Sequence, residues 1–339
     1  MFEPPTFADI LRARQIVSRY LPRTPLLPSL SLSKLLGFQL YLKFENYQPI
    51  GAFKVRGGLN LVASLASGER TRGVITASTG NHGQSIAYAA RTFGVRAVIV
   101  MPEESNPDKV ESMANLGAEI VFCGRDFEEA RLKAEQMAHD RRMHYVHPAN
   151  EPLLIAGVGT YGLEIVEDLP DVQNIIVPIG AGSGICGTAI VAKSIHPQIR
   201  IIGVQAEKAP SVYLSWKEQR VVDTASCATF AEGLATRTAF ALPLHIMRQL
   251  VDDIVLVSED ELKHAIILLL EKVHTIAEGA GAASTAAAIK LKDRLQGQRV
   301  ACVLSGGNLP LSTLQRILVE TRPSCVEDAA ANELAQADT

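Results

Sequence analysis

The chain has 339 residues, of which 47% are hydrophobic and 20% charged, and its formal net charge is −3. This length allows two domains with a large buried core, and the composition is that of an ordinary globular protein. Without a basic excess to neutralise phosphates, the charge balance argues against nucleic acid and membrane surfaces as partners. No apolar run is long enough to span a bilayer, and residues 1–5 lack the features of a signal peptide.

Elements in the first half of the sequence alternate between strands and helices. Apolar spacing predicts a helix over 7–20, a short helix over 31–36, a strand over 39–44 and a helix over 58–65. Further strands are predicted over 73–77, 95–101, 119–123 and 144–147, separated by helices over 84–93, 107–116 and 126–142. This alternation predicts βαβ units, and therefore an α/β fold with a parallel sheet covered on both faces.

The second half repeats the same alternation. Strands are predicted over 174–179, 200–205, 254–257 and 300–304, and helices over 153–167, 184–194, 259–274, 281–295 and 311–320. The first of these helices is expected to be interrupted by a turn at Gly157 and Gly159, and residues 207–243 are expected to be irregular. The alanine-rich, acidic residues 323–339 are expected to be a tail.

Five cysteines are scattered without a CxxC pair: Cys123, Cys186, Cys227, Cys302 and Cys325. Their odd number and irregular spacing argue against a disulfide framework and against a zinc site. We therefore expect a cytoplasmic protein with reduced thiols.

Lys54 lies in an apolar, glycine-flanked stretch, with Phe53 and Val55 beside it and Gly57–Gly58 just after. One interpretation is a surface lysine whose stem covers apolar area. The other is a desolvated amine of lowered pKa that forms a Schiff base with an aldehyde. These residues alone do not decide between the two.

A small-residue loop follows the predicted strand at 174–179 and precedes a helix. Its glycines let backbone N–H groups approach an anion at the helix N-terminus, so we expect a phosphate there. Residues 182–187 (GSGICG) also match GxGxxG, and Glu207 lies just beyond the next strand, so the motif alone leaves a nucleotide cofactor open. A plain βα turn is the other alternative.

Four further loops and turns carry polar groups, two of them at the ends of predicted strands. Residues 78–84 (STGNHGQ) offer hydroxyl, amide, imidazole and backbone N–H groups that could hold a carboxylate. No acidic residue lies near His82 in sequence, which favours a loop-ordering role over a general base. Ser305 follows the last strand, and Glu232 and Glu278 lie in small-residue turns.

Taken in order, these motifs resemble the serine/threonine dehydratase and serine racemase family, enzymes of fold-type II that depend on pyridoxal phosphate (PLP). The resemblance covers roughly residues 5–320 and is carried by KFENYQPIGAFKVRG (43–57), STGNHGQ (78–84), GAGS (180–183), EGAG (278–281) and SGGN (305–308). It implies a tryptophan synthase β-like fold of two domains, each with a mostly parallel sheet flanked by helices. The large domain would comprise 1–66 and 150–322, and 67–149 a small domain that closes over the substrate. A homodimer is also implied.

The resemblance also implies roles for individual residues. Lys54 would form the internal aldimine with PLP and then take the α-proton of the substrate. Phe53 would pack against the cofactor ring, Asn81 would bond its 3-hydroxyl, and Ser305 would meet the pyridine nitrogen. The expected phosphate cradle is Gly180, Ala181, Gly182, Ser183 and Gly184, with Gly233 and Glu278 near the ring. Ser78, Thr79, Asn81 and His82 would bind the substrate carboxylate, and Ser78 and Thr79 join Lys54 as expected catalytic residues.

The sequence departs from the family pattern at three places. Thr79 stands where dehydratases commonly carry alanine and racemases serine. Gln205, Ala209 and Ser211 align with the divalent-metal site of the racemases but lack its carboxylates, so we expect no tight metal. Glu232 replaces the usual aspartate, and nearby Arg237 is expected at the surface rather than on a second substrate carboxylate.

The leading hypothesis is an ammonia-lyase that converts L-threonine, L-serine or a related β-hydroxy amino acid to a 2-oxo acid and ammonia by α,β-elimination. The alternatives are a serine racemase with side elimination activity and a dehydratase for an unusual substrate, of the hydroxyectoine-pathway or phenylserine type. A catalytically silent amino-acid sensor is the remote alternative.

Overall fold

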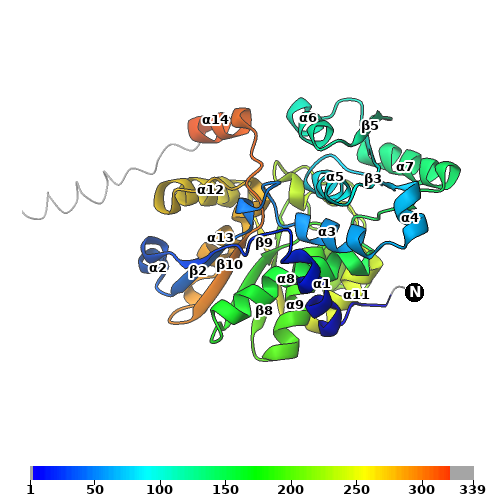
Figure 1. Cartoon of the computed structure of the whole chain (residues 1–339). Coiled ribbons are helices and arrows are strands. Elements are labelled where there is room, and N and C mark those ends of the chain that lie inside the picture. Colours follow the sequence, from blue (N-terminus) through cyan, green and yellow to red (C-terminus); the bar gives the residue numbers. More distant parts are fainter. Residues whose placement is uncertain (1–2, 321–339) are drawn as a thin grey trace, which may run out of the picture.

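Two β-sheets organise the computed structural model, which describes residues 3–320 (Figure 1). The first sheet has the strand order β1-β2-β10-β7-β8-β9, and only β1 runs antiparallel to its neighbour. Its strands are β1 (Leu26–Pro28), β2 (Gln39–Phe44), β10 (Arg299–Leu304), β7 (Asn174–Pro178), β8 (Arg200–Ala206) and β9 (Asp253–Val257). The prediction of an α/β fold with mostly parallel sheets is confirmed.

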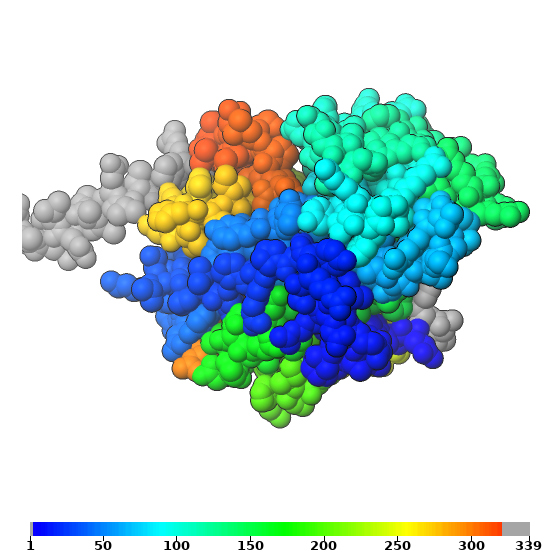
Figure 2. All heavy atoms as spheres, viewed as in Figure 1, coloured from blue at the N-terminus to red at the C-terminus, as the bar shows by residue number. Residues whose placement is uncertain are grey.

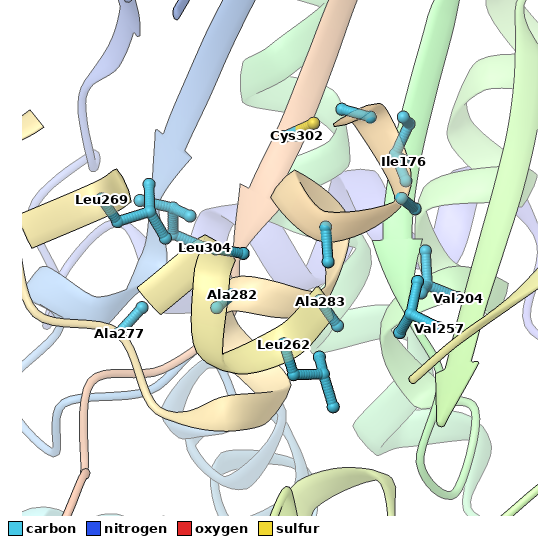
Figure 3. Packing of buried hydrophobic residues seen from close by; sticks show 14 of the residues in the cluster. Ile176, Val204, Val257, Leu262, Leu269, Ala277, Ala282, Ala283, Cys302 and Leu304 are labelled. Carbon is cyan, nitrogen blue, oxygen red and sulfur yellow. The ribbon is translucent and has the colours of Figure 1, made fainter. Parts of the chain in front are cut away.

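Helices cover both faces of the first sheet. Because successive side chains of a strand point to opposite faces, each central strand contributes to two core clusters. On β10, Cys302 and Leu304 belong to the core cluster that includes α12 (Glu259–Val273) and α13 (Gly279–Lys290), as Figure 3 shows. Ala301 and Val303 belong to the opposite cluster. That cluster includes α1 (Phe7–Val17), α8 (Pro152–Asp168) and α9 (Ser183–Ile195).

The second sheet has the order β5-β4-β3-β6 and is parallel throughout. Its strands are β3 (Val74–Ala77), β4 (Ala97–Met101), β5 (Glu119–Phe122) and β6 (His144–Tyr145), all within the segment expected to form the small domain. One face packs on α3 (Val55–Ser64) and α5 (Asn81–Phe93), and the other on α7 (Phe127–Arg141). Below, the second-sheet unit means residues 67–149, and the first-sheet unit means the remaining described residues.

The expected turn at Gly157 and Gly159 is wrong, because α8 runs through both glycines without interruption. A Cβ on Gly157 would lie 2.5 Å from the carbonyl oxygen of Arg56 in α3, and one on Gly159 would lie 2.7 Å from Ile10 in α1. The glycines therefore allow three helices to approach closely. From the sequence alone, this packing role cannot be distinguished from a turn.

The expectation that residues 207–243 are irregular is wrong in part, since α10 (Ser211–Lys217) and a 3₁₀ turn over Glu232–Leu234 lie in this region. A further helix, α11 (Ala241–Leu250), begins at its end. The remaining helices are α2 (Leu30–Leu36), α4 (Ser67–Arg72), α6 (Pro107–Asn115) and α14 (Leu311–Glu320), and further 3₁₀ turns span Glu45–Tyr47 and Lys292–Arg294. The expected tail at 323–339 lies outside the described residues.

The carboxyl ends of the central strands of the first sheet meet at one edge. Leu304 of β10 lies opposite Phe44 of β2, and the register of β10 with β7 brings the ends of these two strands level. Loops that follow such strands converge, which is where open α/β sheets place their ligand sites. Figure 2 shows the second-sheet unit, in cyan and green, against α14, in orange, on one face of the molecule. No helix of residues 3–320 is long and apolar enough to cross a membrane.

Candidate active site

The backbone around Lys54 is fixed to the end of β10. Residues 45–54 leave β2 and return to the sheet edge, where Ala52 forms a bridge with Gly306 and the Phe53 N–H donates to the Ser305 carbonyl at 3.1 Å. Gly51 has φ of +67°, which an L side chain rarely adopts. Lys54 then caps the start of α3, so its side chain begins where a strand-end loop meets a helix N-terminus.

The Lys54 side chain is half-buried, and its amine has no partner among the described residues. Within residues 3–320, its Nζ makes no hydrogen bond or ion pair, and it lies over the ring of Phe53, 5.1 Å from the centroid. Burial lowers the pKa of Lys54 to about 8, and the nearby Glu278 charge opposes that decrease. Of the two interpretations left open by the sequence, this setting supports the desolvated amine, which is nucleophilic near neutral pH.

The loop between β7 and α9 is built to bind an anion. Gly182 has φ of +99°, and a Cβ on Gly180 would lie 2.0 Å from the carbonyl oxygen of Gly233, so both positions require glycine. In the described chain, the backbone N–H groups of residues 181–184 have no acceptor, and the Ser183 hydroxyl has no partner. Unpaired amides at the N-terminus of a 13-residue helix fit a phosphate group.

An aromatic side chain lies between this loop and Lys54. The ring of Phe53 packs edge-on against Tyr161 of α8, with 5.8 Å between the ring centroids. A Cβ on Gly184 would lie 3.0 Å from the Tyr161 hydroxyl and 3.4 Å from Phe53. Ser305 is buried directly after β10, at the same edge. Tyr161 was not identified from the sequence, because nothing near it in the chain marks it as part of a site.

The loop at 78–82 offers backbone amides more than side chains. The Ser78 hydroxyl accepts hydrogen bonds from the N–H groups of Gly83 at 2.8 Å and Gly80 at 3.2 Å, so it orders the loop. Within residues 3–320, the N–H groups of Thr79, Asn81 and His82 have no acceptor. The Thr79 side chain is exposed. These amides lie at the start of α5 and suit a carboxylate.

The His82 side chain points away from that role. Its Nε2 lies 3.0 Å from the Thr76 hydroxyl, which donates to the Val146 carbonyl at 2.8 Å and therefore accepts from the imidazole. Burial lowers the pKa of His82 to about 3, and the Lys54 charge adds to this decrease. The imidazole is neutral and engaged, which leaves its backbone N–H for a ligand.

A hydrogen-bonded chain connects the two sheet units across the site. Asn81 Nδ2 donates to Glu278 Oε1 at 2.7 Å, and Asn308 Nδ2 donates to Asn81 Oδ1 at 2.8 Å. Burial raises the pKa of Glu278, although the Asn81 hydrogen bond opposes the rise. The structure therefore brings together Asn81 and Glu278, which the sequence assigned to the site. It adds Asn308, which belongs to a motif but had no predicted role.

The other charged residues of the Lys54 motif belong to a buried ion cluster. Arg56 forms two hydrogen bonds with Glu45, both at 2.8 Å, and two with Glu164 of α8, at 2.7 and 2.9 Å. Lys43 completes the cluster by pairing with Glu164 at 2.5 Å. Arg56 and Lys43 are 1% and 0% exposed, so this cluster is part of the scaffold that holds the first turn of α3. Glu164 could not be identified from the sequence, since it lies 108 residues from Arg56.

Gln205 and Ser211, which align with the metal site of the racemases, are engaged within the protein. Gln205 Oε1 accepts from the N–H groups of Val212 and Tyr213 at the start of α10, and Ser211 donates to the Thr236 carbonyl at 2.8 Å. In the part of the chain that the structure describes, no group of three His, Cys, Asp or Glu residues could hold a metal. Arg237 is exposed.

Comparisons with known proteins agree with this geometry. The family described as "Pyridoxal-phosphate dependent enzyme" matches residues 17–306. The chain is 41% identical to the L-threonine ammonia-lyase of Thermotoga maritima over 313 residues, which cover 92% of this chain and 78% of that protein. It is 37% identical to L-threonine dehydratase catabolic TdcB of Escherichia coli K12, over 93% and 96% of the two chains. The solved structure of maize serine racemase superposes with a TM-score of 0.89 at 31% identity, over 94% and 98% of the two chains.

Proposed function

The chain belongs to the family of pyridoxal-phosphate dependent enzymes, and we propose that it is an ammonia-lyase that converts L-threonine to 2-oxobutanoate and ammonia. The observation that carries the proposal is the unpaired, half-buried amine of Lys54, whose pKa is lowered to about 8. It lies at a sheet edge that also presents two sets of free backbone amides. One set suits a phosphate and the other a carboxylate. Curated relatives named for this activity match over most of their length.

The residues present fit the cofactor. The free amides of 181–184, with the glycines at 180 and 182, would hold its phosphate. Phe53 would lie along its ring, and the Ser305 hydroxyl would meet the ring nitrogen. Bound pyridoxal phosphate supplies an electron sink for the negative charge that develops at the substrate α-carbon. A neutral hydroxyl at the ring nitrogen, unlike a carboxylate, does not hold that nitrogen protonated.

The chain's own groups then bind the substrate and move its proton. The amides of Thr79, Asn81 and His82 would orient the substrate carboxylate at the positive end of α5. Lys54 Nζ would accept the α-proton, and a pKa of about 8 places this amine near the range in which a general base works best. The neutral His82 ring takes no part in proton transfer.

A racemase is the second candidate, and the exposed Thr79 hydroxyl favours it. Racemisation needs a proton donor on the face of the substrate opposite Lys54, and Thr79 is the hydroxyl of this loop that the loop itself leaves free. The likeness to maize serine racemase adds support. L-Serine and other β-hydroxy amino acids remain candidate substrates of the lyase.

One assay separates these candidates. Purified holoenzyme is incubated with L-threonine or L-serine, 2-oxo acid is measured, and recovered amino acid is resolved on a chiral column. The lyase predicts 2-oxobutanoate in amounts equal to ammonia and L-threonine of unchanged configuration. Recovery of D-serine without 2-oxo acid would replace the lyase with the racemase. A holoenzyme that releases no 2-oxo acid from any β-hydroxy amino acid and leaves configuration unchanged would refute both.

We also propose that the enzyme is a cytoplasmic homodimer in which residues 67–149 form a small domain and 1–66 with 150–322 a large one. The family resemblance supports the dimer. The composition of the two sheets supports the domain boundaries. The four cysteines within residues 3–320 form no disulfide, which fits a reducing compartment. Sedimentation of the purified protein tests the dimer directly.

A further inference from the structure

An ion pair outside the predicted site connects the two sheet units. Lys109 of α6, in the second-sheet unit, pairs with Glu232 in the 3₁₀ turn of the first-sheet unit. The Lys109 side chain is 12% exposed and that of Glu232 is 57% exposed. Among residues 3–320, no other ion pair joins the second-sheet unit to the first. The pair is therefore placed to fix how the units meet.

This pair borders the hydrogen-bonded chain of the active site. Lys109 and Glu232 line one small cavity together with Glu278 and Asn308. Glu278 and Asn308 are the residues that hold Asn81. Burial raises the pKa of Glu278, and the charges of Lys109 and Lys54 both oppose this rise. Removing the Lys109 charge should therefore affect the pKa of Glu278 as well as the position of the residues around it.

Helix α6 is also packed onto the first turn of α5. A Cβ on Gly83 would lie 2.5 Å from the sulfur of Met113, so the two helices touch without space between them. Because close-packed elements move together, a displacement of α6 would shift the amides at 79–82. Lys54 and Glu278, in contrast, belong to the first-sheet unit.

We propose that Lys109 is a positioning residue, whose pair with Glu232 holds the start of α5 in register with Lys54 and Glu278. The carboxylate-binding amides lie on one unit and the amine on the other, so the site is complete only when the units are held together. The kinetic part of this inference rests on the proposed lyase function.

The test compares four variants of the full-length holoenzyme. K109M removes the charge but keeps the stem, E232Q removes the partner, and K109R restores a cation. The control K290M breaks ion pairs with Glu207 and Glu261 that lie within the first-sheet unit. We expect K109M and E232Q to raise KM for L-threonine about fivefold, the scale of a partly exposed ion pair, and K109R and K290M to stay near wild type.

Hydrogen exchange gives a readout that does not depend on activity. In K109M and E232Q, exchange should quicken in α6 and in the first turn of α5 but not in α12. If wild-type enzyme forms no 2-oxo acid, the proposed function fails, and exchange alone decides the role of Lys109. The inference is overturned if K109M matches wild type in exchange, if K109R is impaired as much as K109M, or if exchange quickens throughout the protein.

Discussion

Removing Arg56 should destabilise the protein more than any surface charge would. Arg56→Met deletes four charge-assisted hydrogen bonds of 2.7–2.9 Å and leaves the carboxylates of Glu45 and Glu164 facing Lys43 alone. Breaking a buried ion pair by removing one partner costs about 3–5 kcal/mol, because the remaining charge stays desolvated. For a chain of this size, we expect the melting temperature to fall by roughly 4–7 °C.

The assay is urea unfolding of wild type and variant, followed by far-UV circular dichroism at neutral pH. Arg125→Met is the matched control, since Arg125 pairs with Glu129 but is 90% exposed, and it should leave the free energy of unfolding close to that of wild type. Should Arg56→Met unfold within about 1 kcal/mol of wild type, the ion cluster would not hold the first turn of α3, and this reasoning would be refuted.

Two further predictions concern the site. Gly180→Ala places a Cβ 2.0 Å from the carbonyl oxygen of Gly233, so cofactor affinity should fall at least about tenfold by equilibrium dialysis, and an unchanged affinity would contradict the proposed cradle. Because burial lowers the pKa of His82 to about 3, the unfolded chain binds a proton that the folded protein excludes. This contribution to stability is complete above pH 6.5 and is lost as the pH falls towards 3. In His82→Asn, the free energy of unfolding, measured with urea at a series of pH values, should therefore depend less steeply on pH. An unaltered pH dependence would count against a neutral His82.

The alternation of strands and helices could be predicted from sequence because it depends on local periodicity. Every strand predicted after residue 73 has its counterpart in the structure, and the acidic first turn of α12 is capped by Ser258 as the helix dipole favours. Gly157 and Gly159 of α8 could not be interpreted correctly from the sequence. Their reason lies in Arg56 and Ile10, far away in the chain.

The site residues also fall into those that could be predicted from local sequence and those that could not. Lys54 and the glycine-rich loop at 180–184 belong to continuous sequence motifs, so they could be identified from the sequence. Tyr161, Glu164 and Lys109 lie on helices whose local sequence looks like ordinary core or surface, and only the packing of distant elements gives them neighbours. The sequence also could not show that the Ser78 hydroxyl accepts hydrogen bonds from backbone N–H groups of its own loop, because this depends on backbone geometry.

The most direct test of the account asks which lysine carries the cofactor. Holoenzyme is reduced with borohydride, which fixes the bond between a lysine amine and the cofactor aldehyde, and the digested peptides are weighed by mass spectrometry. We expect the added mass on the peptide containing Lys54, none on the fully buried Lys43, and loss of both the label and 2-oxobutanoate formation in Lys54→Ala. A label on any other lysine, or lyase activity that survives in Lys54→Ala, would contradict it.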